Sequence, residues 1–215
     1  PDIRRTLVGG EVRRCMIRSS NTRNKGGVLH TFGLLVGGRE DRTLRVMLDS
    51  KAQEWQRSRG DFQARVNPGL PLDCAWLARE KKAFVACSDG TIKVFVEGKQ
   101  ELTHTATLRG HSDWVYSLAV NADATRIASA GADGTVKIWS TAENKPLATL
   151  AQLTPRSDDW LIVAADGWYA ASKPEVVNWQ AANVEVAPDK LAALQNPEAV
   201  QQTLAGEPPA APPLP

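Results

Sequence analysis

The chain has 215 residues, of which 42% are hydrophobic, and its formal net charge is +2. This composition is typical of a globular protein and excludes an intrinsically disordered chain. No apolar run approaches the ~18 residues that a membrane span needs, and the first residues lack the apolar core of a secretory signal. The sequence therefore predicts a soluble protein without membrane contact, and it leaves the cellular compartment unknown.

The charge is distributed unevenly. Residues 1–66 contain 14 Lys and Arg and 7 Asp and Glu, a net charge of +7, whereas residues 67–215 have a net charge of −5. A basic segment of this size can attract phosphate or an acidic partner. Its arginines are scattered among strand-like stretches without regularly interleaved aromatic residues, so nucleic-acid binding is not favoured.

One eight-residue pattern occurs three times along the chain: EDRTLRVM at 40–47, SDGTIKVF at 88–95 and ADGTVKIW at 132–139. The aspartates that anchor the copies, Asp41, Asp89 and Asp133, are separated by 48 and 44 residues. Each copy ends in the β-branched alternation of a half-buried strand. A period of this length is close to that of a four-stranded propeller blade.

The third copy predicts a complete antiparallel meander. We expect strands at 114–120, 126–130, 135–139 and 146–150, joined by turns at 121–125 and 132–134. The Asp-Gly pairs at 89–90 and 133–134 supply the positive φ that such tight turns favour.

Of the three cysteines, Cys15, Cys74 and Cys87, no two have the spacing of a metal-binding pair or a haem-attachment motif. If residues 79–82 form a hairpin turn, Cys74 lies opposite Cys87 on neighbouring strands. Two alternatives follow: a cross-strand disulfide, or two small buried thiols inside a sheet.

After the repeats, residues 183–206 favour helix. Asn196 is a suitable N-cap, Pro197 and Glu198 suit a first turn, and Gly206 suits a helix end. The segment EPPAAPPLP at 207–215 is predicted to be extended and mobile. Two roles are open for it: a linker or frayed tail, or a ligand of a proline-recognising domain.

The stretch TLRGHSDWVYSLAVNADATRIASAGADGTVKIWS at 107–140 resembles a nearly complete WD repeat. It has the Gly110-His111 opening, the Asp133-Gly134 turn and the closing aromatic Trp139, with Ser140 in place of the final Asp. The resemblance is also good over 68–106, and it is degraded over 1–50, where Met47 stands at the Trp position and no Gly-His pair occurs. Residues 158–179 resemble the closing segment of many bacterial WD-type propellers, through Asp166, Gly167, Trp168, Tyr169, Ser172 and Trp179.

The resemblance implies an all-β fold, a partial WD-type β-propeller with short C-terminal helices and a Pro-rich tail. We expect about four blades of four-stranded antiparallel meanders, at about 1–50, 51–104, 105–145 and 146–182, then a helical extension at 183–206 and a flexible tail at 207–215. Propellers close with ~4 to 8 blades, and WD-type propellers mostly have more than the blades expected here, so the chain is either truncated or assembles with other blades. The resemblance favours the C-terminal part of a larger bacterial protein. Unclosed strand edges favour association.

His111, Ser129 and Asp133 are the residue types of a nucleophilic triad. The resemblance implies a different role, because in WD repeats these positions and the one held here by Trp139 form a buried structural network of hydrogen bonds. The chain also has no Gly-x-Ser-x-Gly nucleophile elbow. We therefore expect no catalytic residue and no enzyme. The first two copies lack a matching His, so we expect the loops of these blades to be less rigidly anchored.

No metal site or cofactor is predicted. The three histidines, His30, His104 and His111, are too few and too dispersed for a His-rich ligand set. The glycine pairs at 9–10, 26–27 and 37–38 lack the lysine and the helix that a phosphate-binding loop requires.

The expected partner surface combines the loop at 109–114 and the turn at 132–134 with the equivalent turns near 39–42 and 88–90. Its candidate residues are Arg109, Asp113, Trp114, Arg39 and Arg42. An aromatic side chain among charges has the composition of an interface hot spot, although Trp114 could instead pack inward at the start of a strand.

The predicted function is a non-catalytic scaffold that binds a protein partner of unknown identity. The alternative is a propeller appendage of a larger bacterial enzyme or haem-containing electron-transfer protein, with the active domain upstream. Fold alone does not decide between them.

Overall fold

The computed structural model describes residues 15–24, 27–36, 43–49, 54–56, 71–77, 79–97, 102–181, 184–207 and 209–212. The chain divides into two compact units, residues 1–133 and residues 134–215. Of the residues predicted to carry function, Arg39 and Arg42 lie outside the described ranges.

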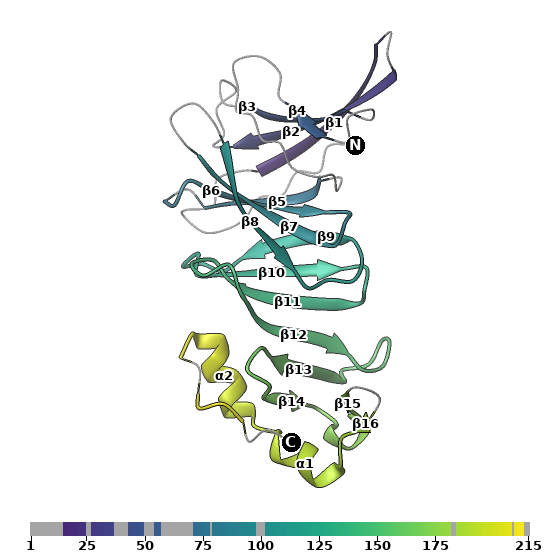
Figure 1. The fold of residues 1–215 in the computed structure, drawn as a ribbon, viewed down its shortest axis with the longest axis vertical. Coiled ribbons are helices and arrows are strands. Elements are labelled where there is room, and N and C mark those ends of the chain that lie inside the picture. The colour runs from purple at the N-terminus through teal and green to yellow at the C-terminus, as the bar shows by residue number, and fades with distance from the viewer. Residues whose placement is uncertain are drawn as a thin grey trace. The chain divides into compact units, whose positions relative to one another are not determined.

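The first unit contains two antiparallel four-stranded sheets, each a simple meander. One has the order β1-β2-β3-β4, and the other has the order β5-β6-β7-β8 (Figure 1). The strands of the first sheet are β1 (Cys15–Asn24), β2 (Gly27–Val36), β3 (Thr43–Asp49) and β4 (Glu54–Gln56). Those of the second are β5 (Pro71–Leu77), β6 (Lys82–Cys87), β7 (Thr91–Glu97) and β8 (Leu102–Arg109).

The β5–β8 sheet is packed around β6, all six residues of which are buried. Its run of small and apolar side chains is typical of a strand that is covered on both faces, where alternation with polar residues is not needed. Phe84 on β6, together with Ile92 and Val94 on β7, is almost fully buried in this core.

The hairpin between β5 and β6 corrects the prediction for the cysteines. Cys74 pairs with Val85, while Cys87 pairs with Pro71. The turn lies between Leu77 and Lys82 and is centred one residue earlier than expected, which moves the partner of Cys74 by two residues. A further register shift between Pro71 and Asp73 moves the partner of Cys87 by three. Cys87 is a free, buried thiol, so these two cysteines are not bonded to each other.

The remaining strands of the first unit form the hairpin of β9 (Val115–Val120) and β10 (Arg126–Gly131). A side-chain contact joins β9 to the preceding sheet: the Leu118 amide donates to Oδ2 of Asp73 on β5, at 2.8 Å. The predicted turn at 121–125 separates the two strands.

The second unit contains a meander of β11 (Thr135–Ser140), β12 (Pro146–Gln152), β13 (Trp160–Ala164) and β14 (Tyr169–Ala171). These four strands are neighbours in sequence order and pair antiparallel. The expected starts at Thr135 and Pro146 are confirmed. The expected positive φ is also found at both Asp-Gly turns, with +76° at Gly90 and +78° at Gly134.

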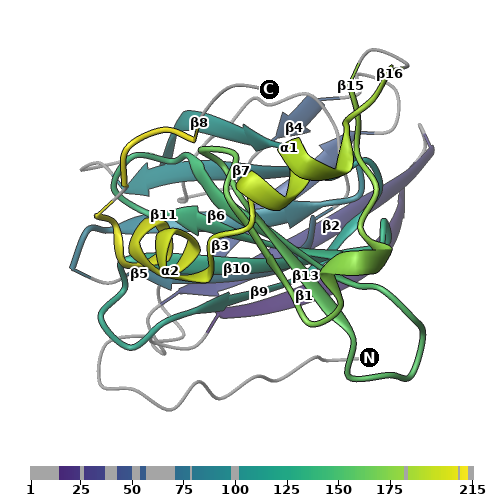
Figure 2. The same cartoon turned by 90° about the horizontal axis from the view of Figure 1, so that it is seen from below.

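Short elements follow the strands of the second unit. They are a 3₁₀ turn η1 (Pro174–Val176), the two-residue strands β15 (Gln180–Ala181) and β16 (Val184–Glu185), and the helices α1 (Pro188–Ala193) and α2 (Pro197–Ala205). Figure 2, seen from below, shows both helices in front of the strands of this unit. None of the described helices is long and apolar enough to cross a membrane.

The predicted signals at the ends of α2 are confirmed. The side chain of Asn196 accepts a hydrogen bond from the Ala199 amide at 3.0 Å, and Gly206 ends the helix in the left-handed conformation. Val200 of α2 packs with Ala164 and Ala170 on β13 and β14. The fold class is therefore all-β: antiparallel meanders with a few short helices, consistent with a partial WD-type propeller.

Candidate functional site

The loop between β8 and β9, residues 110–114, is anchored by the hydrogen bonds of a buried histidine. Nδ1 of His111 lies 2.9 Å from Oδ2 of Asp133, and its Nε2 lies 2.8 Å from Oγ of Ser129. The backbone amide of Ser112 also donates to Asp133, at 3.0 Å. With Asp133 ionised, Nδ1–H donates to the carboxylate, and Nε2 accepts from the serine hydroxyl. The loop is thus tied to a turn 22 residues further along the chain.

Gly131, at the end of β10, makes room for this histidine. A Cβ built at Gly131 would overlap Nδ1 of His111 and would lie 2.6 Å from Oδ1 of Asp133. No side chain fits at that position without displacing the pair. Glycine is therefore required by close approach, although its φ is not positive.

The contacts run from serine to histidine to aspartate, as in a hydrolytic triad. Ser129, however, is only 1% exposed, and the side chain of His111 is not exposed at all. Since a nucleophilic hydroxyl must reach a substrate carbonyl, the buried Ser129 cannot act as one in this conformation. The chemistry available to these side chains is hydrogen bonding within the protein.

Trp139, the fourth residue of the expected network, belongs to β11 in the second unit. Its side chain is almost fully buried there. Its membership of the network with His111 stays a prediction.

A second contact fixes the loop from the side of the preceding repeat. A Cβ built at Gly90 would lie 2.9 Å from the carbonyl oxygen of His111 and 3.2 Å from that of Asp113. The backbone of the loop therefore passes directly over the Asp89-Gly90 turn. Glycine serves two purposes here, since it adopts a φ of +76° and lets the loop approach.

The exposed side of the loop carries the candidate partner residues Arg109, Asp113 and Trp114. Trp114 is 45% exposed, which contradicts the alternative in which it packs inward. Oδ1 of Asp113 accepts a hydrogen bond from the Trp114 amide at 2.7 Å and so restrains this part of the loop.

Sequence reasoning missed Tyr116, which is 55% exposed. Its ring lies against that of Trp114 in an edge-on arrangement, with 6.1 Å between the ring centroids. The spacing of two residues contained the signal, because alternate residues of an extended strand point to the same face. Together the two rings form an aromatic pair on the surface of the first unit.

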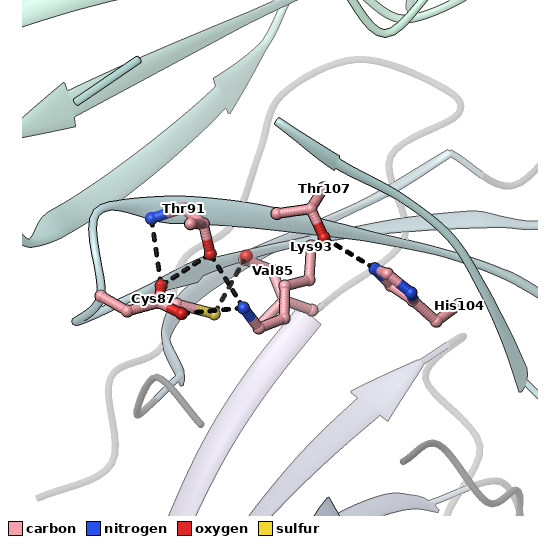
Figure 3. A network of polar contacts seen from close by, with 7 residues as sticks. Val85, Cys87, Thr91, Lys93, His104 and Thr107 are labelled. Atoms are coloured by element: carbon pink, nitrogen blue, oxygen red, sulfur yellow. Dashed lines mark hydrogen bonds and ion pairs between the residues drawn. The ribbon is translucent and has the colours of Figure 1, made fainter. Parts of the chain in front are cut away.

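The matching turn of the preceding repeat is tied in another way (Figure 3). Asp89 accepts hydrogen bonds from the backbone and the hydroxyl of Thr91, at 3.1 and 2.6 Å, and forms an ion pair of 2.9 Å with Nζ of Lys93. All three residues lie within one short stretch of chain. In the same region, Nε2 of His104 lies 3.0 Å from Oγ1 of Thr107.

The electrostatics of this turn follow from burial and from Lys93. Burial alone would raise the pKa of Asp89, but hydrogen bonds from Thr91 and Lys93 and the charge of Lys93 lower it overall. Burial raises the pKa of the nearby Cys87 thiol to about 12, against the opposing effect of Lys93. Cys87 is thus a neutral, unreactive thiol at physiological pH.

Among the described residues, no group of three or more His, Cys, Asp or Glu side chains is placed to hold a metal ion. The side chains of His104 and His111 take part in hydrogen bonds, the first with Thr107 and the second with Ser129 and Asp133.

Comparison with known proteins identifies the repeat that surrounds this loop. Residues 102–140 match the family described as "WD domain, G-beta repeat". A segment of 53 residues is 43% identical to part of myosin heavy chain kinase D from Dictyostelium discoideum. That alignment covers 25% of this chain and only 6% of the kinase. The chain therefore contains a WD repeat, a type of repeat that generally mediates protein interactions and is not itself catalytic.

Proposed function

We propose that this chain is a non-catalytic scaffold that binds a protein partner through the loop at 109–114. The observation that carries the proposal is the exposed aromatic pair of Trp114 and Tyr116, on a loop held by His111 and Asp133. The WD repeat at 102–140 supports the same function.

The physical argument rests on contact area and preorganisation. Trp and Tyr are enriched among the residues that dominate binding energy at protein interfaces. A surface that is already ordered loses less conformational entropy on binding. The contacts to Asp133 and Gly90 order this loop before any partner arrives. Arg109 and Asp113 beside the pair would contribute the polar rim.

The proposal predicts that Trp114→Ala weakens partner binding. A hot-spot tryptophan contributes about 2 kcal/mol or more, so the Kd should rise roughly 30-fold. The control is Trp160→Ala, because Trp160 is 43% exposed and lies in the other unit. Partners captured by the wild-type chain are identified, and the Kd of one purified partner is then measured by calorimetry for each variant.

Melting curves should first show that both variants fold. Equal loss of binding in both variants, or full binding by a folded Trp114→Ala protein, would remove the loop from the interface.

We also propose that the chain is the C-terminal part of a larger bacterial propeller, with the blade boundaries given above. Support comes from the repeat count, because about four blades are fewer than WD-type propellers mostly contain. Exposed strand edges pair with other chains, so the isolated chain should associate as its concentration rises. Sedimentation equilibrium tests this, and a monomer whose mass is independent of concentration contradicts it.

One observation favours a second candidate function, a propeller appendage of a larger enzyme or haem-containing electron-transfer protein. The similar protein from Dictyostelium is named a kinase, and the aligned segment is only 6% of it. In such an arrangement, the repeats would bind a partner or substrate, and another domain would carry out the reaction. The sequence of the complete gene distinguishes the candidates, through the presence or absence of a catalytic or CxxCH motif upstream.

A further inference from the structure

The proline-rich segment after α2 lies against a turn of its own unit. The indole Nε1 of Trp168 donates a hydrogen bond to the carbonyl oxygen of Ala210, at 3.1 Å. A Cβ built at the neighbouring Gly167 would lie 3.3 Å from Cγ of Pro212, so the proline ring sits directly over that glycine. Both contacts join residues 209–212 to the turn between β13 and β14.

Burial differs along this segment. Pro209 and Pro212 are half-buried, whereas Ala210 and Ala211 between them are exposed. The chain bends at Ala210, the residue whose carbonyl oxygen accepts from the indole. The two half-buried prolines have the spacing of a PxxP motif.

The turn that receives the prolines is anchored on its other side. The hydroxyl of Thr203 on α2 donates to the carboxylate of Asp166, the first residue of the turn. Trp168 packs against the apolar cluster that includes Val200 and Leu204 of the same helix. Because the helix fixes the turn and the indole together, the Nε1–H points at a fixed place on the surface.

We propose that the turn of Asp166, Gly167 and Trp168 is a binding site for an extended proline-rich segment with PxxP spacing. In this chain its own residues 209–212 occupy the site. Here an indole N–H donates to a backbone carbonyl, and a proline ring lies over the glycine next to that indole. Aromatic side chains are also what lines the grooves that hold PxxP segments. A partner that supplies a PxxP segment competes with the chain's own.

The competition can be estimated from chain length. Residues 209–212 follow α2 closely, so their effective concentration at the site is on the order of millimolar. A free peptide must exceed that value to displace them. Exchanging the two prolines for alanine should therefore open the site without changing the turn or the helix.

The test uses the full chain, labelled with ¹⁵N, and the synthetic peptide EPPAAPPLP as the probe. The Trp168 indole signal is assigned by its absence in Trp168→Phe, which keeps an aromatic ring and loses the N–H. The peptide is titrated into the wild-type chain, into the double variant P209A/P212A, and into P209A/P212A combined with Trp168→Phe. A second peptide, with alanine at the two positions that match Pro209 and Pro212, is the matched control.

We expect the double variant to bind the peptide at least about tenfold more tightly than the wild type, because its own segment no longer competes. Adding Trp168→Phe should weaken that binding about fivefold, the worth of one hydrogen bond. Equal binding by wild type and double variant, or equal binding of the two peptides, would overturn the proposal.

The melting temperature of each variant shows whether it is folded. Weaker peptide binding by a variant that is folded is then due to loss of the site and not to misfolding. The proposal is independent of the interaction loop at 109–114, because Trp168 belongs to the other unit.

Discussion

The turns at Asp89 and Asp133 occupy the same position in two successive repeats, yet the structure stabilises them differently. Asp133 accepts from His111 and from the amide of Ser112, both in the loop more than 20 residues upstream. Asp89 accepts from Thr91 and Lys93, within four residues. The first arrangement fixes a loop between repeats, and the second fixes only the turn itself.

The difference extends to the strand before each turn. With the two aspartates aligned, Gly131 corresponds to Cys87, and Ser129 corresponds to Val85. The histidine needs the space above the glycine and the hydroxyl of the serine. Where the histidine is missing, a thiol and an apolar side chain stand instead. The two repeats therefore differ at several contacting positions together, and each residue of the Asp89 repeat is compatible with the absence of the histidine.

The largest effect is expected from Gly131→Ala. The added methyl group would overlap the ring of His111, and the cost of overpacking plus a broken buried hydrogen bond is about 3 kcal/mol in the free energy of unfolding. Urea denaturation measures this value. The matched control is Cys87→Ala, where a Cβ is already present and the loss is about 1 kcal/mol.

The cause is tested by repeating the exchange in a His111→Ala background. There the methyl group meets no ring, and only Oδ1 of Asp133 still lies too close to it. Gly131→Ala should therefore cost less than in the wild type, a departure from additivity. An unchanged cost in both backgrounds would show that the histidine is not what excludes the side chain.

Gly90→Ala should cost about 2 kcal/mol, more than Gly134→Ala at about 1 kcal/mol. Both residues have positive φ, so both exchanges introduce backbone strain. Only Gly90 has loop carbonyl oxygens within 4 Å of the added Cβ, whereas nothing lies that close to Gly134. Thermal unfolding compares the two variants. Equal melting temperatures would argue that the loop does not press on the Asp89 turn.

The smallest effect is expected from Lys93→Met. Lys93 is only 4% exposed, and its Nζ forms an ion pair of 2.9 Å with the carboxylate of Asp89. The exchange should lower the free energy of unfolding by about 1.5 kcal/mol, measured by urea denaturation at pH 7.

The cost of Lys93→Met should also depend on pH. The folded protein holds the pKa of Asp89 below its ordinary value of 3.8. The stabilisation is therefore present above pH 3.8 and is lost as the pH falls through the lowered folded-state pKa. The difference between wild type and Lys93→Met should shrink in that acid range, and a difference independent of pH would contradict the assignment.

The meanders of the third repeat and the ends of α2 could be predicted from sequence because their signals are local. Asp-Gly marks a tight turn, alternation marks a strand, and Asn196 and Gly206 mark the two ends of a helix. The residue opposite Cys74 on the neighbouring strand could not be predicted. A hairpin turn centred one residue away changes the register of the whole strand pair. Turn residues alone therefore do not determine the register of a hairpin, which also depends on side-chain packing.

By itself, the sequence determined the repeat, its strand order and the polar residues around the loop. It did so because period, turn chemistry and residue type are properties of neighbouring residues. The tertiary structure alone decided that Trp114 faces outward beside Tyr116, that Lys93 forms an ion pair with Asp89, and that Ala210 meets the indole of Trp168. Each of these depends on which side chains burial brings together, and burial is settled only when the whole unit packs.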